Sequence, residues 1–174
     1  QTCALPIWLG YVGFAIAEAC VKSKLQVVGL DTSKDKIELV KSKLSSKYFF
    51  ATSEYSAIKD CEIIIICVPT PLTDNYKPDL SILKDVVSKL KPFIVPSMLV
   101  INESTSYPGT LRNLIANKLE NRCEFASAPE RVDPSNENWG IKNTPRLVSG
   151  LTPKATKRAT ELYSKICDNV IEVS

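Results

Sequence analysis

The stretch Glu62-Ile63-Ile64-Ile65-Ile66-Cys67-Val68 decides the fold class. Its four consecutive isoleucines predict a strand that is buried on both faces, as central strands of parallel sheets are. On both sides of this stretch, helix-like and strand-like segments alternate along the chain. This alternation predicts an α/β fold with a doubly wound, mainly parallel sheet.

The residue pattern places further elements around this strand. Strands are expected at residues 25–30, 48–51, 98–102, 123–127, 146–149 and 170–173. Helices are expected at residues 12–22, 33–44, 54–59, 78–90, 108–119 and 152–166. The last helix begins at Thr152-Pro153, which is a favourable pair for an N-cap and a first helical position.

Composition excludes several classes of protein. The 174 residues are 44% hydrophobic and 24% charged, which is typical of one globular domain. The net charge of +3 is spread over mixed clusters, so neither a nucleic-acid partner nor a membrane partner is predicted. Without a signal peptide or an apolar run near the roughly 18 residues of a membrane span, a cytoplasmic location is expected. Six cysteines without a CxxC pair, in a chain without histidine, predict reduced thiols and no metal site.

Both ends of the chain suggest a piece of a longer protein. Residues 1–7, QTCALPI, match the translation of a sequencing-adapter oligonucleotide, so we expect an artefact there and a native domain over residues 8–174. The first strand of the fold would then be truncated or replaced. At the other end, the strand-like residues 170–173 stop at Ser174 without a closing helix, so we expect more sequence to follow.

A glycine-containing turn precedes the first helix. Leu9-Gly10-Tyr11-Val12-Gly13 matches the last part of GxGxxG, the dinucleotide-binding fingerprint of Rossmann-type sheets, although Trp8 stands at the first glycine position. Alone, this pattern equally fits an ordinary turn. Asp31, about 20 residues later at a strand end, favours NAD over NADP because an acid can bind both ribose hydroxyls. Lys36 is either a solvated surface lysine or a contact to the adenosine ribose.

Polar residues follow three further strands at the edge where α/β sheets bind ligands. Thr70 lies in a Pro-Thr-Pro turn, Thr105 follows Glu103 and Ser104, and Glu130 stands beside Arg131. Each has an ordinary explanation as a turn, a helix cap or a surface ion pair. Together they predict a pocket in which a dinucleotide faces an anionic substrate rich in hydroxyl groups.

Taken in order, these motifs resemble the UDP-glucose/GDP-mannose dehydrogenase family over nearly all of residues 9–174. The resemblance rests on GYVG, Asp31, CVPTP at 67–71, ESTSYPGT at 103–110 and PERVDP at 129–134. The stretches at 76–81 and 143–148 are most similar to the branch that acts on UDP-N-acetylhexosamines, with UDP-N-acetylglucosamine the first choice of substrate. The chain departs from the family pattern at Ala15 and Ser135.

The resemblance implies a role for each motif residue. NAD would be bound by Gly10, Tyr11, Val12, Gly13, Asp31, Lys36, Thr70 and Thr105. The sugar nucleotide would be bound by Glu130, Arg131 and Val132, and Thr105 and Glu130 would support catalysis.

The resemblance also implies chemistry that this chain does not contain in full. Family members oxidise the C6 alcohol of a UDP-sugar in two hydride transfers through a cysteine nucleophile. That cysteine, the catalytic lysine, the central helix and the UDP-sugar-binding domain would all lie beyond residue 174, so these residues alone are expected to be inactive. The complete enzyme is expected to be a homodimer or a higher homo-oligomer.

Three other interpretations stay open. A UDP-glucose 6-dehydrogenase differs in its substrate pocket but hardly in its cofactor half. A β-hydroxyacid dehydrogenase shares the Rossmann start but needs no cysteine nucleophile. A non-catalytic module that senses NAD or a nucleotide fits the fold, yet leaves the acidic clusters around Glu103 and Glu130 unexplained.

Overall fold

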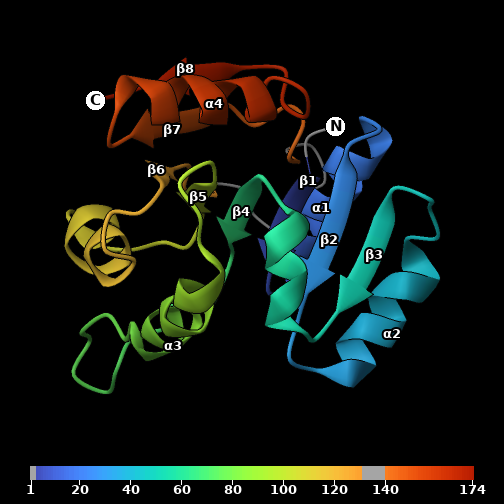
Figure 1. The fold of residues 1–174 in the computed structure, drawn as a ribbon, viewed down its shortest axis with the longest axis horizontal. Coiled ribbons are helices and arrows are strands. Elements are labelled where there is room, and N and C mark those ends of the chain that lie inside the picture. Colours follow the sequence, from blue (N-terminus) through green and yellow to red (C-terminus); the bar gives the residue numbers. More distant parts are fainter. Residues whose placement is uncertain (1–2, 131–139) are drawn as a thin grey trace.

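The computed structural model describes residues 3–130 and 140–174. They form one eight-stranded sheet in the order β3-β2-β1-β4-β5-β6-β7-β8 (Figure 1). Neighbouring strands are parallel except for β6 and β7, which pair antiparallel. The predicted α/β fold with a doubly wound, mainly parallel sheet is confirmed.

Apart from β1 and η2, which were not expected, the elements follow one another in the predicted order. The first half of the chain contains β1 (Cys3–Ile7), α1 (Tyr11–Lys22), β2 (Gln26–Leu30), α2 (Lys34–Lys43), β3 (Phe49–Thr52), the 3-10 helix η1 (Tyr55–Asp60), β4 (Ile63–Ile66) and α3 (Ser81–Leu90). The second half contains the 3-10 turn η2 (Lys91–Phe93), β5 (Leu99–Asn102), the π-helical segment η3 (Thr110–Ala116), β6 (Glu124–Ser127), β7 (Arg146–Gly150), α4 (Pro153–Tyr163) and β8 (Val170–Glu172).

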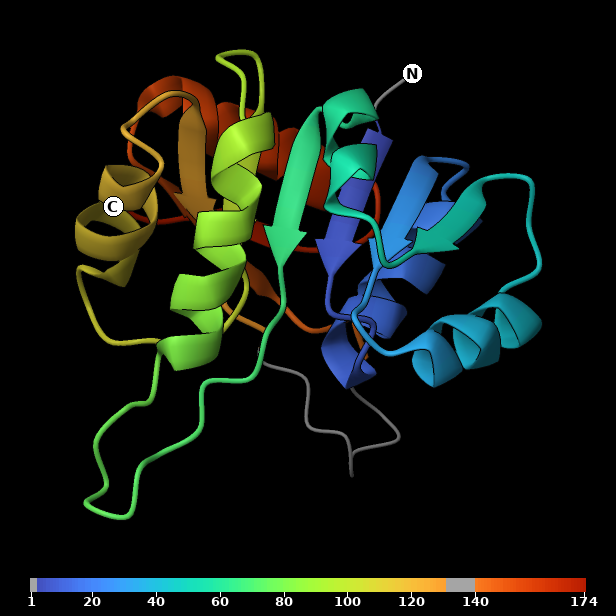
Figure 2. The ribbon, with the colours of Figure 1, turned by 60° about the horizontal axis from the view of Figure 1, so that its bottom comes forward.

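The four isoleucines of β4 explain how the sheet is covered. Ile63 and Ile65 face a core shared with α1 and α4, whereas Ile64 and Ile66 face a core shared with α3 and η3. All four are buried because successive side chains of a strand point to opposite faces. Figure 2 shows α3 in front of the sheet and α4 behind it. The prediction of a strand buried on both faces is therefore confirmed.

The start of the described chain contributes a central strand to the sheet. Residues 3–7 form β1, which pairs with β2 on one side and with β4 on the other. The β1–β2 pairing is interrupted at Leu5 and Pro6, and proline has no N–H to donate to a neighbouring strand. The position of the first strand is thus occupied, by a segment that is an imperfect central strand. The adapter origin of residues 1–7 stays a prediction.

Local capping fixes two of the helix starts. The Thr152 side chain accepts a hydrogen bond of 3.0 Å from the Ala155 amide, with Pro153 in the first turn of α4. The Ser33 hydroxyl likewise caps α2. These two N-terminal boundaries agree with the predicted ones, because the capping residue and the helix are adjacent in the chain.

Other boundaries differ from those expected. Residues 55–60 form a short 3-10 helix, and α3 begins at Ser81 rather than at Pro78. Pro78 instead bridges to Leu72, and the Asp79 side chain accepts a hydrogen bond from the Ser81 amide. The Pro-Asp pair therefore completes a turn before the helix. Among the described residues, no helix has the length and apolar character needed to cross a membrane.

Candidate functional site

The turn between β1 and α1 brings Trp8 and Gly13 into close contact. A Cβ atom at Gly13 would lie 2.0 Å from the carbonyl oxygen of Trp8, so only glycine fits there. Trp8 has a φ of 77°, in the left-handed region where side chains other than glycine are strained. The backbone conformation therefore favours glycine at position 8, which is the first glycine position of the GxGxxG pattern.

Asp31 lies directly after β2, at the same edge of the sheet. Its carboxylate accepts hydrogen bonds of 2.9 Å from the Leu9 amide and from the Ser33 amide. The Leu9 bond ties the end of β2 to the β1–α1 turn. Asp31 is 2% exposed and lines a cavity of about 430 Å³ together with Trp8, Thr32 and Tyr55.

A second cavity, of about 400 Å³, lies on the other side of Trp8. The predicted site residues that line it are Gly10, Tyr11, Val12, Thr70, Thr105 and Glu130. The Thr70 hydroxyl donates a hydrogen bond of 2.6 Å to the Thr105 carbonyl oxygen, which joins the edges of β4 and β5. The structure thus gathers residues from four separate segments of sequence.

Trp8 lines both cavities and so stands between them. The Lys36 ammonium lies 4.5 Å from the centroid of the Trp8 ring, at cation–π distance. Neither of the two sequence interpretations of Lys36 foresaw this partner. Trp8 is the residue shared by the lining of the cavity that contains Asp31 and the lining of the cavity that contains Thr105.

A buried ion cluster lies behind the second cavity. Arg146, the first residue of β7, donates to the Glu103 carboxylate at 2.7 Å and also to the Glu130 carboxylate. A third bond of 3.1 Å runs from Arg146 to the Ala128 carbonyl oxygen. Tyr163 of α4 donates its hydroxyl to Glu103. The cluster holds the ends of β5 and β6 against β7 and α4.

Burial governs the protonation of this cluster. Burial raises the pKa of Glu103 to about 7, although Arg146 and the Tyr163 hydrogen bond act in the opposite direction. For Arg146, burial alone would lower the pKa, but the neighbouring Glu103 raises it above its ordinary value. Arg146 therefore stays charged, while Glu103 titrates near neutral pH.

Arg146 and Tyr163 were not expected as site residues. Glu130 was interpreted with its sequence neighbour Arg131, whereas the described partner of Glu130 is Arg146. The only signal in the sequence was an arginine at the start of an otherwise apolar strand. Two predicted substrate contacts, Arg131 and Val132, lie outside the described residues. The same holds for Ser135, where the chain departs from the family pattern.

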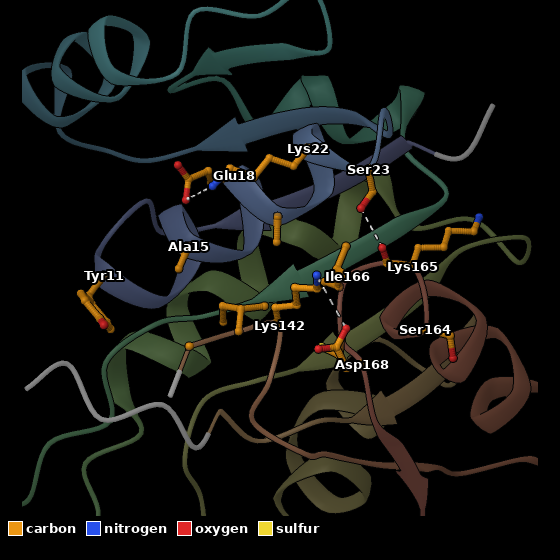
Figure 3. A pocket seen from close by; sticks show the side chains of 14 residues that line it. Tyr11, Ala15, Glu18, Lys22, Ser23, Lys142, Ser164, Lys165, Ile166 and Asp168 are labelled. Carbon is orange, nitrogen blue, oxygen red and sulfur yellow. Dashed lines mark hydrogen bonds and ion pairs between the residues drawn. The ribbon is translucent and has the colours of Figure 1, made fainter. Parts of the chain in front are cut away.

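A third cavity, of about 670 Å³, lies elsewhere in the described chain. It lies between α1 and the segment that follows α4 (Figure 3). Its charges are largely paired with each other: Lys22 with Glu18 at 3.2 Å and Lys142 with Asp168 at 4.0 Å. Tyr11 is the one predicted site residue among its lining residues. It lacks the motif residues of the sheet edge, so we place the candidate site at the two smaller cavities.

Comparison with known proteins agrees with this geometry. Residues 38–167 match the family model described as "UDP-glucose/GDP-mannose dehydrogenase family, NAD binding domain". The chain belongs to this family. NAD is the cofactor that this dehydrogenase domain binds, and the resemblance seen in the sequence is confirmed.

Relatives of this dehydrogenase domain are longer proteins. The chain is 29% identical to the UDP-N-acetyl-D-glucosamine 6-dehydrogenase of Salmonella typhi, covering 92% of this chain and 42% of that protein. It is 26% identical to the UDP-N-acetyl-D-mannosamine dehydrogenase of Methanococcus maripaludis, covering 97% of this chain and 43% of that protein. The chain therefore spans less than half the length of the curated relatives it matches.

Solved structures share the fold of this dehydrogenase domain. The UDP-D-ManNAc dehydrogenase of Pyrococcus horikoshii has a TM-score of 0.89 at 28% identity, covering 99% of this chain and 47% of that one. A GDP-mannose dehydrogenase of Pseudomonas aeruginosa, at 20% identity, matches with a TM-score of 0.87 over 100% of this chain and 46% of that one. The second likeness shows the fold alone.

Trp8→Gly should open the cofactor site of this dehydrogenase domain. Glycine adopts the required φ without strain and removes the ring from between the two cavities. We expect calorimetric titration to show NAD binding tighter by about tenfold or more than in the unsubstituted chain. Trp8→Phe keeps an aromatic ring at this position and serves as the control. Equal affinities in all three chains would contradict the account of Trp8.

Glu103→Gln should change how stability depends on pH. The folded pKa of about 7 exceeds the ordinary 4.5, so the folded state binds this proton more tightly than the unfolded state. The stabilisation is complete below pH 4.5 and is lost as pH rises through 7. The corresponding loss in the free energy of unfolding is about 3 kcal/mol. Urea unfolding should show this loss in the unsubstituted chain and in Glu161→Gln, an exposed control, but not in Glu103→Gln. The same pH slope in all three chains would contradict the assignment.

Proposed function

We propose that this chain supplies the NAD-binding half of a nucleotide-sugar 6-dehydrogenase that oxidises a UDP-N-acetylhexosamine at C6. UDP-N-acetylglucosamine is the first choice of sugar, and UDP-glucose is the alternative. The observation that carries the proposal is the position of Asp31. Its buried carboxylate stands at the end of β2, tied to the turn that contains Gly10 and Gly13.

The residues present fit the two ends of NAD. Asp31 is suited to accept hydrogen bonds from the adenosine ribose hydroxyls and would repel a 2′-phosphate. The segment from Gly10 to Gly13 forms the N-terminus of α1. Its amide groups and the helix dipole favour binding of the pyrophosphate there. Since Asp31 fixes the adenosine end, the cavity with Thr70 and Thr105 would take the nicotinamide end. Trp8 is the residue that does not fit.

The remaining motif residues would bind and orient NAD and the sugar nucleotide. Bound NAD supplies the hydride acceptor for C6. Thr70 and Thr105 would hold the ring edge or a water molecule through their hydroxyl and carbonyl groups. Glu130, held by Arg146, would present a fixed carboxylate toward the sugar. Lys36 would be free to approach the adenosine ribose once the Trp8 ring is absent, and Arg131 and Val132 would contact the sugar nucleotide.

The rest of the reaction would be carried by sequence outside these residues. We propose that residues 8–174 form one NAD-binding domain and that a central helix and a UDP-sugar-binding domain complete the enzyme as a homodimer or higher oligomer. The support is that the relatives are more than twice as long as the matched part. The N-acetylhexosamine preference is supported by relatives named for UDP-N-acetyl-D-glucosamine and UDP-N-acetyl-D-mannosamine.

Turnover by the complete gene product tests the proposal. We expect about two NADH per molecule of UDP-N-acetylglucosamine, because an alcohol reaches a carboxylate in two hydride transfers. Absorbance of NADH would be followed with UDP-glucose in a parallel reaction. Turnover of UDP-glucose alone would favour the alternative substrate. NAD binding without turnover of either sugar would favour a non-catalytic nucleotide sensor.

A further inference from the structure

Two thiols touch at the edge of the sheet opposite the candidate cofactor site. The sulfur atoms of Cys3 and Cys61 are 3.2 Å apart, close enough for a hydrogen bond between them. Cys3 is the first residue of β1, and Cys61 lies between η1 and β4. From there β1 and β4 run in parallel toward the candidate site (Figure 2). These two cysteines, here called the thiol pair, are both free thiols.

The main chain holds the thiol pair in place. The Glu62 amide donates a hydrogen bond of 3.1 Å to the Cys3 carbonyl oxygen, so the two segments are joined beside the sulfur atoms. Among residues 3–130 and 140–174, no second pair of cysteine side chains shares a hydrogen bond. Cys3 lies in the segment for which an adapter origin is predicted, so we treat the thiol pair as a feature of this polypeptide.

The two thiols differ in access and in acidity. Cys3 is half-buried, whereas Cys61 is 4% exposed. The hydrogen bond from Cys61 lowers the pKa of the Cys3 thiol, although burial and the charges of Asp60 and Glu62 act in the opposite direction. The same contact raises the pKa of Cys61, as does burial. Cys3 is therefore the thiol that solvent reaches and that ionises first, and a thiolate is the nucleophilic form of cysteine.

The neighbouring charges favour one class of oxidant. Asp60 and Glu62 act on Cys3 with negative charge. They repel anionic reagents such as glutathione disulfide, whereas a neutral hydroperoxide meets no such repulsion. A small oxidant also suits a sulfur atom that is only partly exposed. Hydrogen peroxide is therefore the reagent that fits this site.

We propose that the thiol pair is a site of oxidation by hydroperoxides, in which Cys3 is oxidised first and Cys61 then closes a disulfide that fastens β1 to the segment before β4. The Cys3 thiolate attacks one peroxide oxygen and breaks the O–O bond, which gives a sulfenic acid and hydroxide. The Cys61 sulfur then attacks the Cys3 sulfur, and the sulfenic oxygen leaves as water with the Cys61 proton. Two thiols and one hydrogen peroxide thus give one disulfide and two water molecules.

The local structure allows this bond to form. A disulfide needs the two sulfur atoms about 2 Å apart, so they must approach by about 1 Å. Neither cysteine lies inside an element, since Cys3 begins β1 and Cys61 follows η1. The small shift is therefore needed only at the ends of elements.

The disulfide would strengthen the weakest part of the sheet. The pairing of β1 with β2 is interrupted at Leu5 and Pro6. A covalent bond to the β4 side would close a loop that contains β1, β2 and β3, and a loop of this length restricts the unfolded chain considerably. Because the thiol pair lies at the opposite edge from Asp31 and Thr70, its test does not depend on NAD binding.

Peroxide treatment of the chain tests the assignment. After exposure to about one equivalent of hydrogen peroxide, digestion without reductant and mass spectrometry should find the Cys3 peptide joined to the Cys61 peptide. The intact chain should lose about 2 Da, and two of its six thiols should no longer react with an alkylating reagent. Dithiothreitol should restore both thiols.

Cys123 provides a matched control. It is also half-buried, but it has no sulfur partner, and burial raises its pKa to about 12. Peroxide should therefore oxidise Cys3 at least about tenfold faster than Cys123. In Cys61→Ser, Cys3 should stop at the sulfenic acid, gain about 16 Da and react with dimedone. Cys123→Ser should form the disulfide as the unsubstituted chain does.

A second measurement needs no substitution. Oxidation should raise the temperature of thermal unfolding by about 10 °C for a loop of this length, and dithiothreitol should reverse the change. Differential scanning calorimetry of the oxidised and the reduced chain would show it. An unfolding temperature that stays the same or falls on oxidation would overturn the claim that the bond fastens β1.

Three other results would overturn the assignment of the site. The first is an oxidised chain in which all six thiols still react, and the second is equal oxidation rates for Cys3 and Cys123. The third is a disulfide between other cysteines, or between two chains through Cys3, because the thiol pair would then not be the reacting unit.

Discussion

The hydrogen bonds of β1 set the geometry of the whole sheet edge. β1 lies between β2 and β4, and the Trp8 amide extends this pairing with a bond of 2.7 Å to the Leu30 carbonyl oxygen. Because all three strands are parallel, their carboxyl ends reach the same edge, which brings the Gly10 turn, Asp31 and Thr70 together. The Leu9 amide then fixes the Asp31 carboxylate from the same turn. The candidate cofactor site therefore depends on the one strand whose sequence suits a central position least.

The other half of the site depends on charge rather than on main-chain pairing. Arg146 joins two acids whose sequence positions are 27 residues apart, since Glu103 and Glu130 both bind its guanidinium. Burying such charges costs free energy that their attraction recovers only with good geometry, so a trio of this kind is better explained by positioning than by stability. Removing Arg146 alone would leave two acids buried together. Arg146 thus holds Glu130, which lines the cavity with Thr70 and Thr105.

Much of the fold could be predicted from the sequence because its signals are local. The isoleucines of β4 and the Thr152-Pro153 start of α4 are recognised from adjacent residues alone. The position of Asp31 at a strand end was also predictable, since its distance along the sequence from the Gly10 turn follows from one βαβ unit. The start of α3 was misplaced because Pro78-Asp79 suits both a helix start and a turn, and only the contact with Leu72 decides between them.

The buried ion cluster of Glu103, Arg146 and Glu130 could not be predicted, because it depends on contacts between distant segments. Arg146 is 43 residues from Glu103, and nothing near either residue in the sequence indicates the other. The role of Trp8 was visible only in part: the missing glycine was evident, but the ring between two cavities and its contact with Lys36 required the structure.

The most direct test of the account is a crystal structure of the Trp8→Gly chain with NAD. The account predicts adenosine ribose hydroxyls at about 3 Å from the Asp31 carboxylate and the nicotinamide ring in the cavity that contains Thr70 and Thr105. NAD bound instead in the large cavity between α1 and the segment after α4, or with its ribose away from Asp31, would contradict it.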